Sequence, residues 1–139
     1  LGGISIPSDK GLEGHSDGDP LTHSIIDALL GAANLGDIGR HFPPGDPRFK
    51  GVSSIVLLSK VRVLLIGAHW NIMNIDATIM AETPKLQSYI EEMCSKLATS
   101  LDIEQSKISV KSKSGNGLGF VGSGEGIAGH AVALLESVS

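Results

Sequence analysis

The stretch Asn71-Ile-Met-Asn-Ile-Asp-Ala-Thr-Ile-Met80 alternates in polarity and decides the fold class. Ile75, Ala77 and Ile79 fall on one face of an extended chain, and polar side chains fall on the other. Successive side chains of a strand point to opposite faces, so the pattern predicts a strand that is buried on one side only. The segments before and after this strand must therefore cover one face of the sheet to which it belongs.

Three helices are expected around this strand. Asp19-Pro20 places an N-cap carboxylate before a proline at the first helical position, and Gly36 is expected to end this helix. Ser53 or Ser54 caps a second helix. Thr83-Pro84 repeats the first start signal and predicts a third helix that runs to about residue 101. The expected inward residues of the second and third helices are Ile55, Leu58, Val61, Leu65, Leu86, Ile90, Met93 and Leu97.

Further strands are expected at residues 1–7, 107–111 and 127–138, with a glycine-rich loop at 114–126. The last segment is apolar on both faces, as in a buried strand or a buried helix, and we favour a strand. The order predicts one α/β (α+β) sandwich domain over residues 1–139, a small mixed sheet with helices packed on one face. The other face stays bare, which predicts self-association.

Composition excludes several classes of partner. The chain has 139 residues, a net charge of −4 and five aromatic residues, and its basic residues are scattered, so a nucleic-acid partner is not expected. No apolar run reaches the roughly 18 to 20 residues that span a bilayer, so no membrane partner is expected. The single cysteine, Cys94, lies in an apolar helical pattern, which favours burial over catalysis and suits a reducing compartment.

The segment from His15 to Asp27 contains two histidines and three carboxylates in thirteen residues, around an expected helix start. Backbone N–H groups and the dipole favour an anion there, and His15 and Ser16 can donate hydrogen bonds to a phosphate oxygen. His23 and Asp27 are four residues apart and share a helix face. Alternatively, the carboxylates are only caps and His23 is a structural histidine. One histidine and one carboxylate do not complete a zinc site.

Three other features bear on function. Asp37 follows a helix C-terminus, where a carboxylate is poorly placed for the dipole, although a turn aspartate is an equal alternative. Lys85 falls in the first turn of the expected third helix, an unfavourable place that indicates a phosphate partner. Gly117, Gly119 and Gly122 match a dinucleotide fingerprint, but too few residues follow for its helix, strand and acidic contact.

A series of motifs recurs in the order of a known family. They are His15-Ser-Asp-Gly-Asp19, His23 with Asp27-Ala-Leu-Leu-Gly31, Gly36-Asp-Ile-Gly39, Phe42-Pro43, Asp46-Pro47, Phe49-Lys-Gly51, Ala81-x-x-Pro-Lys85 and Leu118-Gly-Phe-x-Gly122-x-Gly-Glu-Gly-Ile-Ala128. Over essentially its whole length the chain resembles the 2-C-methyl-D-erythritol 2,4-cyclodiphosphate synthases of non-mevalonate isoprenoid biosynthesis.

The resemblance implies a homotrimer with active sites between subunits and sheets facing the centre. It implies an intramolecular phosphoryl transfer. The 2-phosphate of 4-diphosphocytidyl-2-C-methyl-D-erythritol 2-phosphate attacks the β-phosphate, which gives the cyclodiphosphate and CMP. The setting would be a bacterial cytoplasm or a plastid-type organelle. Zinc and a magnesium or manganese ion would hold the phosphates.

The resemblance also assigns roles to residues. His15 and Ser114 would be catalytic, and His23 would be a zinc ligand. His15 and Ser16 would hold the attacking phosphate. The remaining substrate contacts implied by the resemblance are Asp37, Ile38, Gly39, Phe42 and Asp46 around the methylerythritol unit, Ala81, Pro84 and Lys85 around the cytidine diphosphate, and Phe120 near the trimer cavity.

Several departures weaken these expectations. The family's first strand, whose Asp-x-His motif supplies the other two zinc ligands, is not in this sequence. Asn116 stands where an acidic ligand of the second metal is usual, and an amide is a weaker ligand for a hard cation. Pro44 replaces a substrate-loop aspartate, and Ser123 replaces an arginine of the cavity. The alternative function is a catalytically weakened or inactive trimeric homologue that only binds the cytidine nucleotide.

Overall fold

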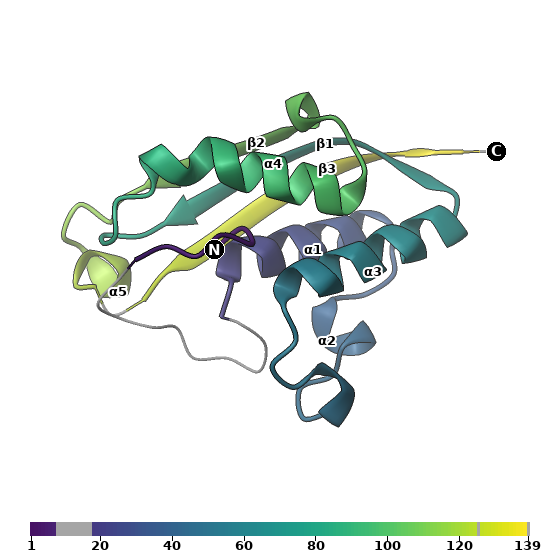
Figure 1. The fold of residues 1–139 in the computed structure, drawn as a ribbon, viewed down its shortest axis with the longest axis horizontal. Coiled ribbons are helices and arrows are strands. Elements are labelled where there is room, and N and C mark those ends of the chain that lie inside the picture. Colours follow the sequence, from purple (N-terminus) through teal and green to yellow (C-terminus); the bar gives the residue numbers. More distant parts are fainter. Residues whose placement is uncertain (8–17, 125, 139) are drawn as a thin grey trace.

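A computed structural model describes residues 1–7, 18–124 and 126–138. In this part of the chain, three strands form one sheet in the order β2-β1-β3 (Figure 1). The strands are β1 (Trp70–Met80), β2 (Ile108–Lys113) and β3 (Ala128–Ser137). β1 pairs parallel with β2 and antiparallel with β3. The small mixed sheet predicted from the sequence is confirmed.

Three helices cover one face of this sheet (Figure 1). They are α1 (Pro20–Ala32), α3 (Ser54–Gly67) and α4 (Ile90–Leu101). Ile75, Ala77 and Ile79 are buried beneath them, as the alternation of β1 predicted. Shorter elements connect these: α2 (Ile38–His41), α5 (Gly119–Gly122) and 3-10 turns at Pro47–Phe49, Gln87–Tyr89 and Gln105–Lys107. None of the helices described is both long enough and apolar enough to cross a membrane.

The first two helices begin as the sequence predicted. Asp19 is the N-cap of α1, with Pro20 at the first helical position. Ser53, the first of the two candidate caps, caps α3. The expected end of α1 at Gly36 is wrong, because the helix ends at Ala32. Asn34 adopts the left-handed conformation that closes a helix, with a φ of 57°.

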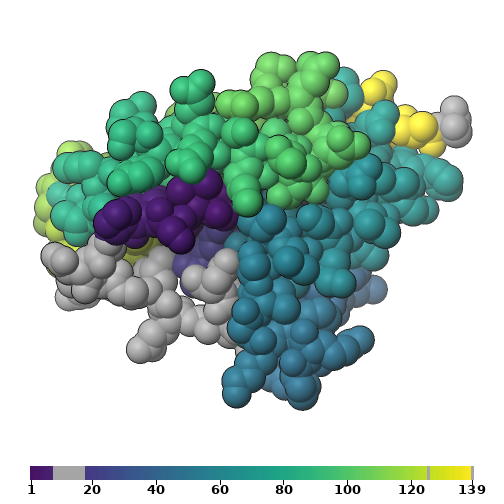
Figure 2. All heavy atoms as spheres, viewed as in Figure 1, coloured from purple at the N-terminus to yellow at the C-terminus, as the bar shows by residue number. Residues whose placement is uncertain are grey.

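The expected strand at residues 1–7 is wrong. Gly2 and Gly3 have φ values of 58° and 76°, and the Ile4 N–H donates to the Leu1 carbonyl at 2.9 Å, so the segment turns instead of extending. It lies across α3 and α4 (purple in Figure 2). A Cβ on Gly3 would lie 2.5 Å from Cγ1 of Ile55. The glycine pair therefore serves a tight turn and a close approach.

The expected start of the third helix at Thr83-Pro84 is also wrong. The helix α4 begins at Ile90, after residues 81–86 have left β1 in an irregular path. Lys85 therefore does not lie in a first helical turn, and the dipole reason for giving it a phosphate partner no longer applies. Leu86 is buried, so the segment is still packed against the core.

The last segment is a strand, as favoured. On β3, Val132 and Leu134 are each 63% exposed, whereas Ala131, Ala133 and Leu135 pack against the core. The sheet face opposite the helices is therefore bare in the single chain. Cys94 is 7% exposed on α4, which confirms its expected burial.

Candidate active site

The carboxyl ends of β1 and β2 lie side by side. Met80 and Lys113 are partners at the end of the parallel ladder, and the Ala81 N–H extends it by donating to the Lys113 carbonyl at 2.9 Å. Parallel strands place their carboxyl ends at one edge of a sheet, where ligands of α/β proteins commonly bind. Two segments distant in sequence, 81–87 and 112–116, thus meet at this edge.

A pocket of about 180 Å³ lies between these segments. It is lined by Ala81, Lys85, Leu86, Gln87, Ser112, Lys113 and Ser114. Two lysines and two serines are among the lining residues and no acidic residue is, so the composition of the pocket favours an anionic group. Three predicted site residues, Ala81, Lys85 and Ser114, meet here, whereas Pro84 is not among the lining residues.

Ser114 and Asn116 form a local hydrogen-bonded turn. The Ser114 hydroxyl donates to Oδ1 of Asn116 at 3.2 Å, and the Asn116 N–H lies 3.3 Å from the same hydroxyl oxygen. Ser114 is exposed, so its oxygen can also reach a ligand in the pocket. One lone pair of the Asn116 amide oxygen accepts this hydrogen bond, and the oxygen carries no charge. It is therefore a weaker ligand for magnesium or manganese than a carboxylate would be.

A second polar centre surrounds the start of α1. The buried Asp19 carboxylate accepts hydrogen bonds from the Gly2 and Gly3 N–H groups at 3.0 and 3.1 Å and from the Ser54 hydroxyl at 2.9 Å. It also accepts from the N–H and hydroxyl of Thr22 at 2.9 and 2.8 Å. Burial alone raises the pKa of Asp19, but the hydrogen bonds from Thr22 and Gly2 outweigh it and hold that pKa below its ordinary value.

His23 lies on α1 one turn beyond Asp19 and is partly buried. Asp27, the other residue of this face, is exposed and accepts a hydrogen bond from the Ile38 N–H at 2.8 Å, which ties α1 to α2. Across residues 1–7, 18–124 and 126–138, no three His, Cys, Asp or Glu side chains gather closely enough to hold a metal ion. These residues therefore do not make a zinc site by themselves.

The expected methylerythritol residues lie around α2 and the turn that follows it. Asp37 caps α2 by accepting from the Arg40 N–H at 2.9 Å, and Asp46 pairs with Arg48 at 2.8 Å. Phe42 is buried against Phe49 with ring centroids 5.3 Å apart. Ile38 and Gly39 belong to α2 itself. Both carboxylates thus have structural roles in the single chain.

The two groups of predicted residues do not share one pocket in a single chain. The short helix α2 lies below α1 and α3 in Figure 1, whereas α5 and the glycine-rich loop lie at the far left end of the sheet. Phe120, on α5, is 56% exposed. The predicted residues His15 and Ser16 lie outside the described residues, as does Glu125.

Sequence reasoning missed Lys113, Gln87 and Glu82. Lys113 ends β2, and its place at the pocket follows only from the parallel pairing with β1. Glu82 accepts a hydrogen bond from the Gly115 N–H at 2.9 Å, although the two residues are far apart in sequence. The residues of this edge that the sequence did point to, Ala81, Lys85 and Ser114, came from the family resemblance.

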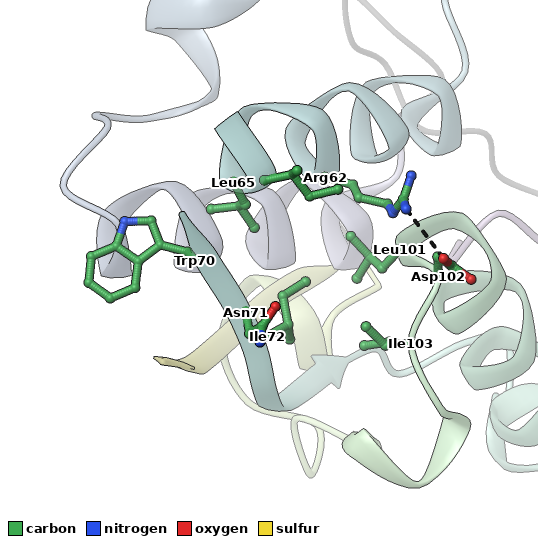
Figure 3. Close-up of a pocket in the computed structure, with 9 residues that line it drawn as sticks. Arg62, Leu65, Trp70, Asn71, Ile72, Leu101, Asp102 and Ile103 are labelled. Carbon is green, nitrogen blue, oxygen red and sulfur yellow. Dashed lines mark hydrogen bonds and ion pairs between the residues drawn. The ribbon is translucent and has the colours of Figure 1, made fainter. Parts of the chain in front are cut away.

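A further pocket, of about 150 Å³, lies at the opposite end of the sheet, between α3, the start of β1 and the end of α4 (Figure 3). Leu65, Ile72, Leu101 and Ile103 give it an apolar floor. The Arg62 guanidinium pairs with Asp102 at 3.2 Å on its rim. None of the predicted site residues lines this second pocket.

Comparison with known proteins gives one consistent result. The model of the YgbB family matches residues 1–136. The 2-C-methyl-D-erythritol 2,4-cyclodiphosphate synthase of Pelotomaculum thermopropionicum is 54% identical over 136 residues, which are 98% of this chain and 84% of that protein. The chain belongs to this family. The resemblance recognised in the motifs is thereby confirmed.

The comparison with solved structures points to the same family as the sequence comparison does. The chain superimposes on the bifunctional IspDF of Campylobacter jejuni with a TM-score of 0.94 and 39% identity, over 99% of this chain and 37% of that one. It also matches the CDP complex of IspF from Plasmodium falciparum with a TM-score of 0.80 and 34% identity, over 91% of this chain and 76% of that one. The relatives therefore include a family member that binds CDP.

Proposed function

We propose that this chain is a cyclodiphosphate synthase, which converts 4-diphosphocytidyl-2-C-methyl-D-erythritol 2-phosphate to 2-C-methyl-D-erythritol 2,4-cyclodiphosphate and CMP. The observation that carries the proposal is the lysine-lined pocket at the ends of β1 and β2, in a chain that is 54% identical to a synthase of this name. Bacterial relatives of this kind support a cytoplasmic setting.

In the proposed reaction, an oxygen of the 2-phosphate forms a bond to the β-phosphorus of the cytidine diphosphate unit. The bond from that phosphorus to the bridging oxygen breaks, and CMP leaves with this oxygen and its electron pair. Negative charge gathers on the transferred phosphoryl group and on the leaving phosphate. Lys85 and Lys113, which line the pocket, would oppose this charge, and the Ser114 hydroxyl, which donates to Asn116 in the free chain, would turn its O–H to the phosphate.

The assembly that we propose is a homotrimer with the bare sheet face turned inward. Val132 and Leu134 expose apolar surface on that face, and neighbouring subunits would remove it from water. Phe120 would face the central cavity from α5. A trimer would also bring the pocket of one subunit to the α2 region of the next, which accounts for the separation of the predicted residues in one chain.

The metal requirement is a separate part of the proposal. His23 would contribute one zinc ligand, but the described residues do not complete the set. Metal analysis of the purified chain tests the assignment. Stoichiometric zinc that is lost in His23→Ala without loss of the fold would support it, and an unfolded variant would make His23 a structural residue.

A binding-only homologue is the second candidate, because the neutral Asn116 amide is already bonded to Ser114 where the family resemblance implies an acidic metal ligand. The decisive experiment measures CMP release from the diphosphate substrate by a protein in which a strand with an Asp-x-His motif precedes Leu1. CMP release supports the synthase. CDP binding without any CMP release would favour the binding-only homologue.

A further inference from the structure

Glu82 connects the two walls of the lysine-lined pocket. Its Oε2 atom accepts a hydrogen bond of 2.9 Å from the N–H of Gly115, and the bond is partly buried. Glu82 directly follows Ala81 on one wall, and Gly115 directly follows Ser114 on the other. One side chain thus joins the segment that carries Lys85 to the segment that carries Ser114.

The loop that Glu82 contacts is built as a closed unit. The Leu118 N–H donates to the Gly115 carbonyl, and the Gly122 N–H donates to the Leu118 carbonyl, each at 2.9 Å. A Cβ on Gly115 would lie 2.6 Å from the Gly122 nitrogen, so the backbone packs against itself without room for a side chain. These contacts fix the internal shape of the loop, so a change in its position relative to the opposite wall would move it as one unit.

Few hydrogen bonds join this loop and the strand end before it to the opposite wall: besides Glu82, the Ser112 hydroxyl donates to Oε1 of Gln87 at 3.4 Å, while Val121 of α5 is buried. The other side-chain hydrogen bonds found for its described residues, Ser114 with Asn116 and Ser123 with Phe120, remain inside the loop. The ladder bond from Ala81 to Lys113 fixes only the strand end from which the loop departs. The Glu82 oxygen reaches the Gly115 N–H from the opposite wall at 2.9 Å, so this acceptor is well suited to hold the loop.

We propose that Glu82 is a positioning residue that holds the 114–122 loop so that Ser114 faces Lys85 across the pocket. The inference rests on the proposed function and names a residue that acts through Gly115 without touching the reacting atoms. A displacement of about 1 Å at a reacting group is costly for catalysis and for binding of a charged ligand. The role requires a side-chain oxygen at position 82 that can accept the hydrogen bond from the Gly115 N–H.

Two substitutions separate the acceptor from the charge. Glu82→Gln keeps the length and an oxygen that accepts from Gly115, whereas Glu82→Ala removes the acceptor. Glu92→Ala is the matched control, because Glu92 is an exposed acidic residue of α4 and does not line the pocket. The readouts are the dissociation constant for CDP by calorimetry and the thermal midpoint of each variant.

For Glu82→Ala we expect CDP binding to weaken roughly tenfold, with a thermal midpoint close to that of Glu92→Ala. Glu82→Gln should bind CDP within about twofold of the wild type, because a neutral acceptor keeps the contact. CDP binding by Glu82→Ala that equals the control would overturn the role of Glu82. A Glu82→Gln variant that binds CDP about tenfold more weakly than the wild type would also overturn it, and this comparison stands even if the alanine variant does not fold.

The same measurements separate this inference from the function on which it rests. A wild-type chain that does not bind CDP at all would overturn the proposed nucleotide pocket, and the role of Glu82 with it. A wild-type chain that binds CDP while every Glu82 variant binds equally well would overturn only the role of Glu82.

Discussion

Lys85 and Lys113 reach one pocket from the ends of two neighbouring strands. Because both are exposed, each ammonium is well hydrated in the free protein, and its contribution depends on a ligand that brings negative charge between them. We expect Lys85→Ala and Lys113→Ala each to weaken CDP binding by about tenfold, as lost charge-assisted hydrogen bonds do. Calorimetric titration at constant ionic strength measures the dissociation constant for CDP of each variant.

Lys60→Ala provides the matched comparison, since Lys60 is an exposed lysine on α3 that does not line this pocket. It changes the net charge of the protein by the same amount. If all three alanine variants lose CDP affinity equally, the effect is one of overall charge, and the pocket is not the nucleotide site.

Cys94 illustrates a residue whose chemistry is set by its surroundings. Burial raises the pKa of its thiol above the ordinary value, so the reactive thiolate is scarce at neutral pH. We expect iodoacetamide to leave Cys94 unmodified in the folded protein at pH 7.5 and to modify it fully after denaturation, as read by mass spectrometry. Rapid modification without denaturant would contradict its place in the core.

At the scale of single residues, the sequence was informative where a family pattern fixes both the residue type and its role. The family resemblance implied roles for Lys85 and Ser114, and both residues line the pocket. Glu82 and Lys113 were not identified, because their roles arise from a backbone N–H and a strand register that no local pattern contains.

At the scale of elements, Asp19 joins three segments of the chain. Its buried carboxylate holds the turn at Gly2 and Gly3 and the starts of α1 and α3. Asp19→Asn puts an N–H₂ group among donors and loses charge-assisted bonds, so we expect it to lower the free energy of unfolding by roughly 3 kcal/mol. Urea denaturation at pH 7 checks this.

The lowered pKa of Asp19 also predicts a pH dependence. Because the pKa is lower in the folded than in the unfolded state, the stabilisation is fully present above the unfolded value and is lost as pH falls through the folded one. The thermal midpoint of the wild type should fall below about pH 4, where Asp groups titrate. Asp19→Asn should lose less over the same range. Parallel curves for the two proteins would contradict this account.

The element-level errors of the sequence analysis share one cause. Residues 1–7 alternate like a strand, but the amides of Gly2 and Gly3 bond to a carboxylate instead of a neighbouring strand. Thr83-Pro84 has the letters of a helix start, yet residues 81–86 are used to build the pocket wall before α4 begins. In both places a long-range contact overrides a local preference. Where the local signal and the packing agree, as in β1, the prediction holds.

At the scale of the whole molecule, the proposed trimer depends on the bare sheet face. Val132 is 63% exposed on that face, and Val63, on the outer surface of α3, is 64% exposed. A lysine at position 132 would place a charge in the proposed subunit interface, where burial without a partner is costly. We expect Val132→Lys to shift the protein from trimer towards monomer in sedimentation velocity.

Val63→Lys adds the same charge at an equally exposed valine and should leave the assembly unchanged. If both variants sediment as the wild type does, the β3 face is not the interface. If both dissociate, the effect comes from added charge rather than from its location.

The strand order has a consequence for the synthesis of the protein. β1 lies in the centre of the described sheet, and one of its edges pairs with β3, which the ribosome makes last of the three strands. While residues 81–127 emerge, that edge and its apolar residues have no partner from the same chain, and open edges recruit strands from other molecules. A nascent chain is therefore most vulnerable to aggregation in this interval, and pauses in translation after β1 would lengthen it.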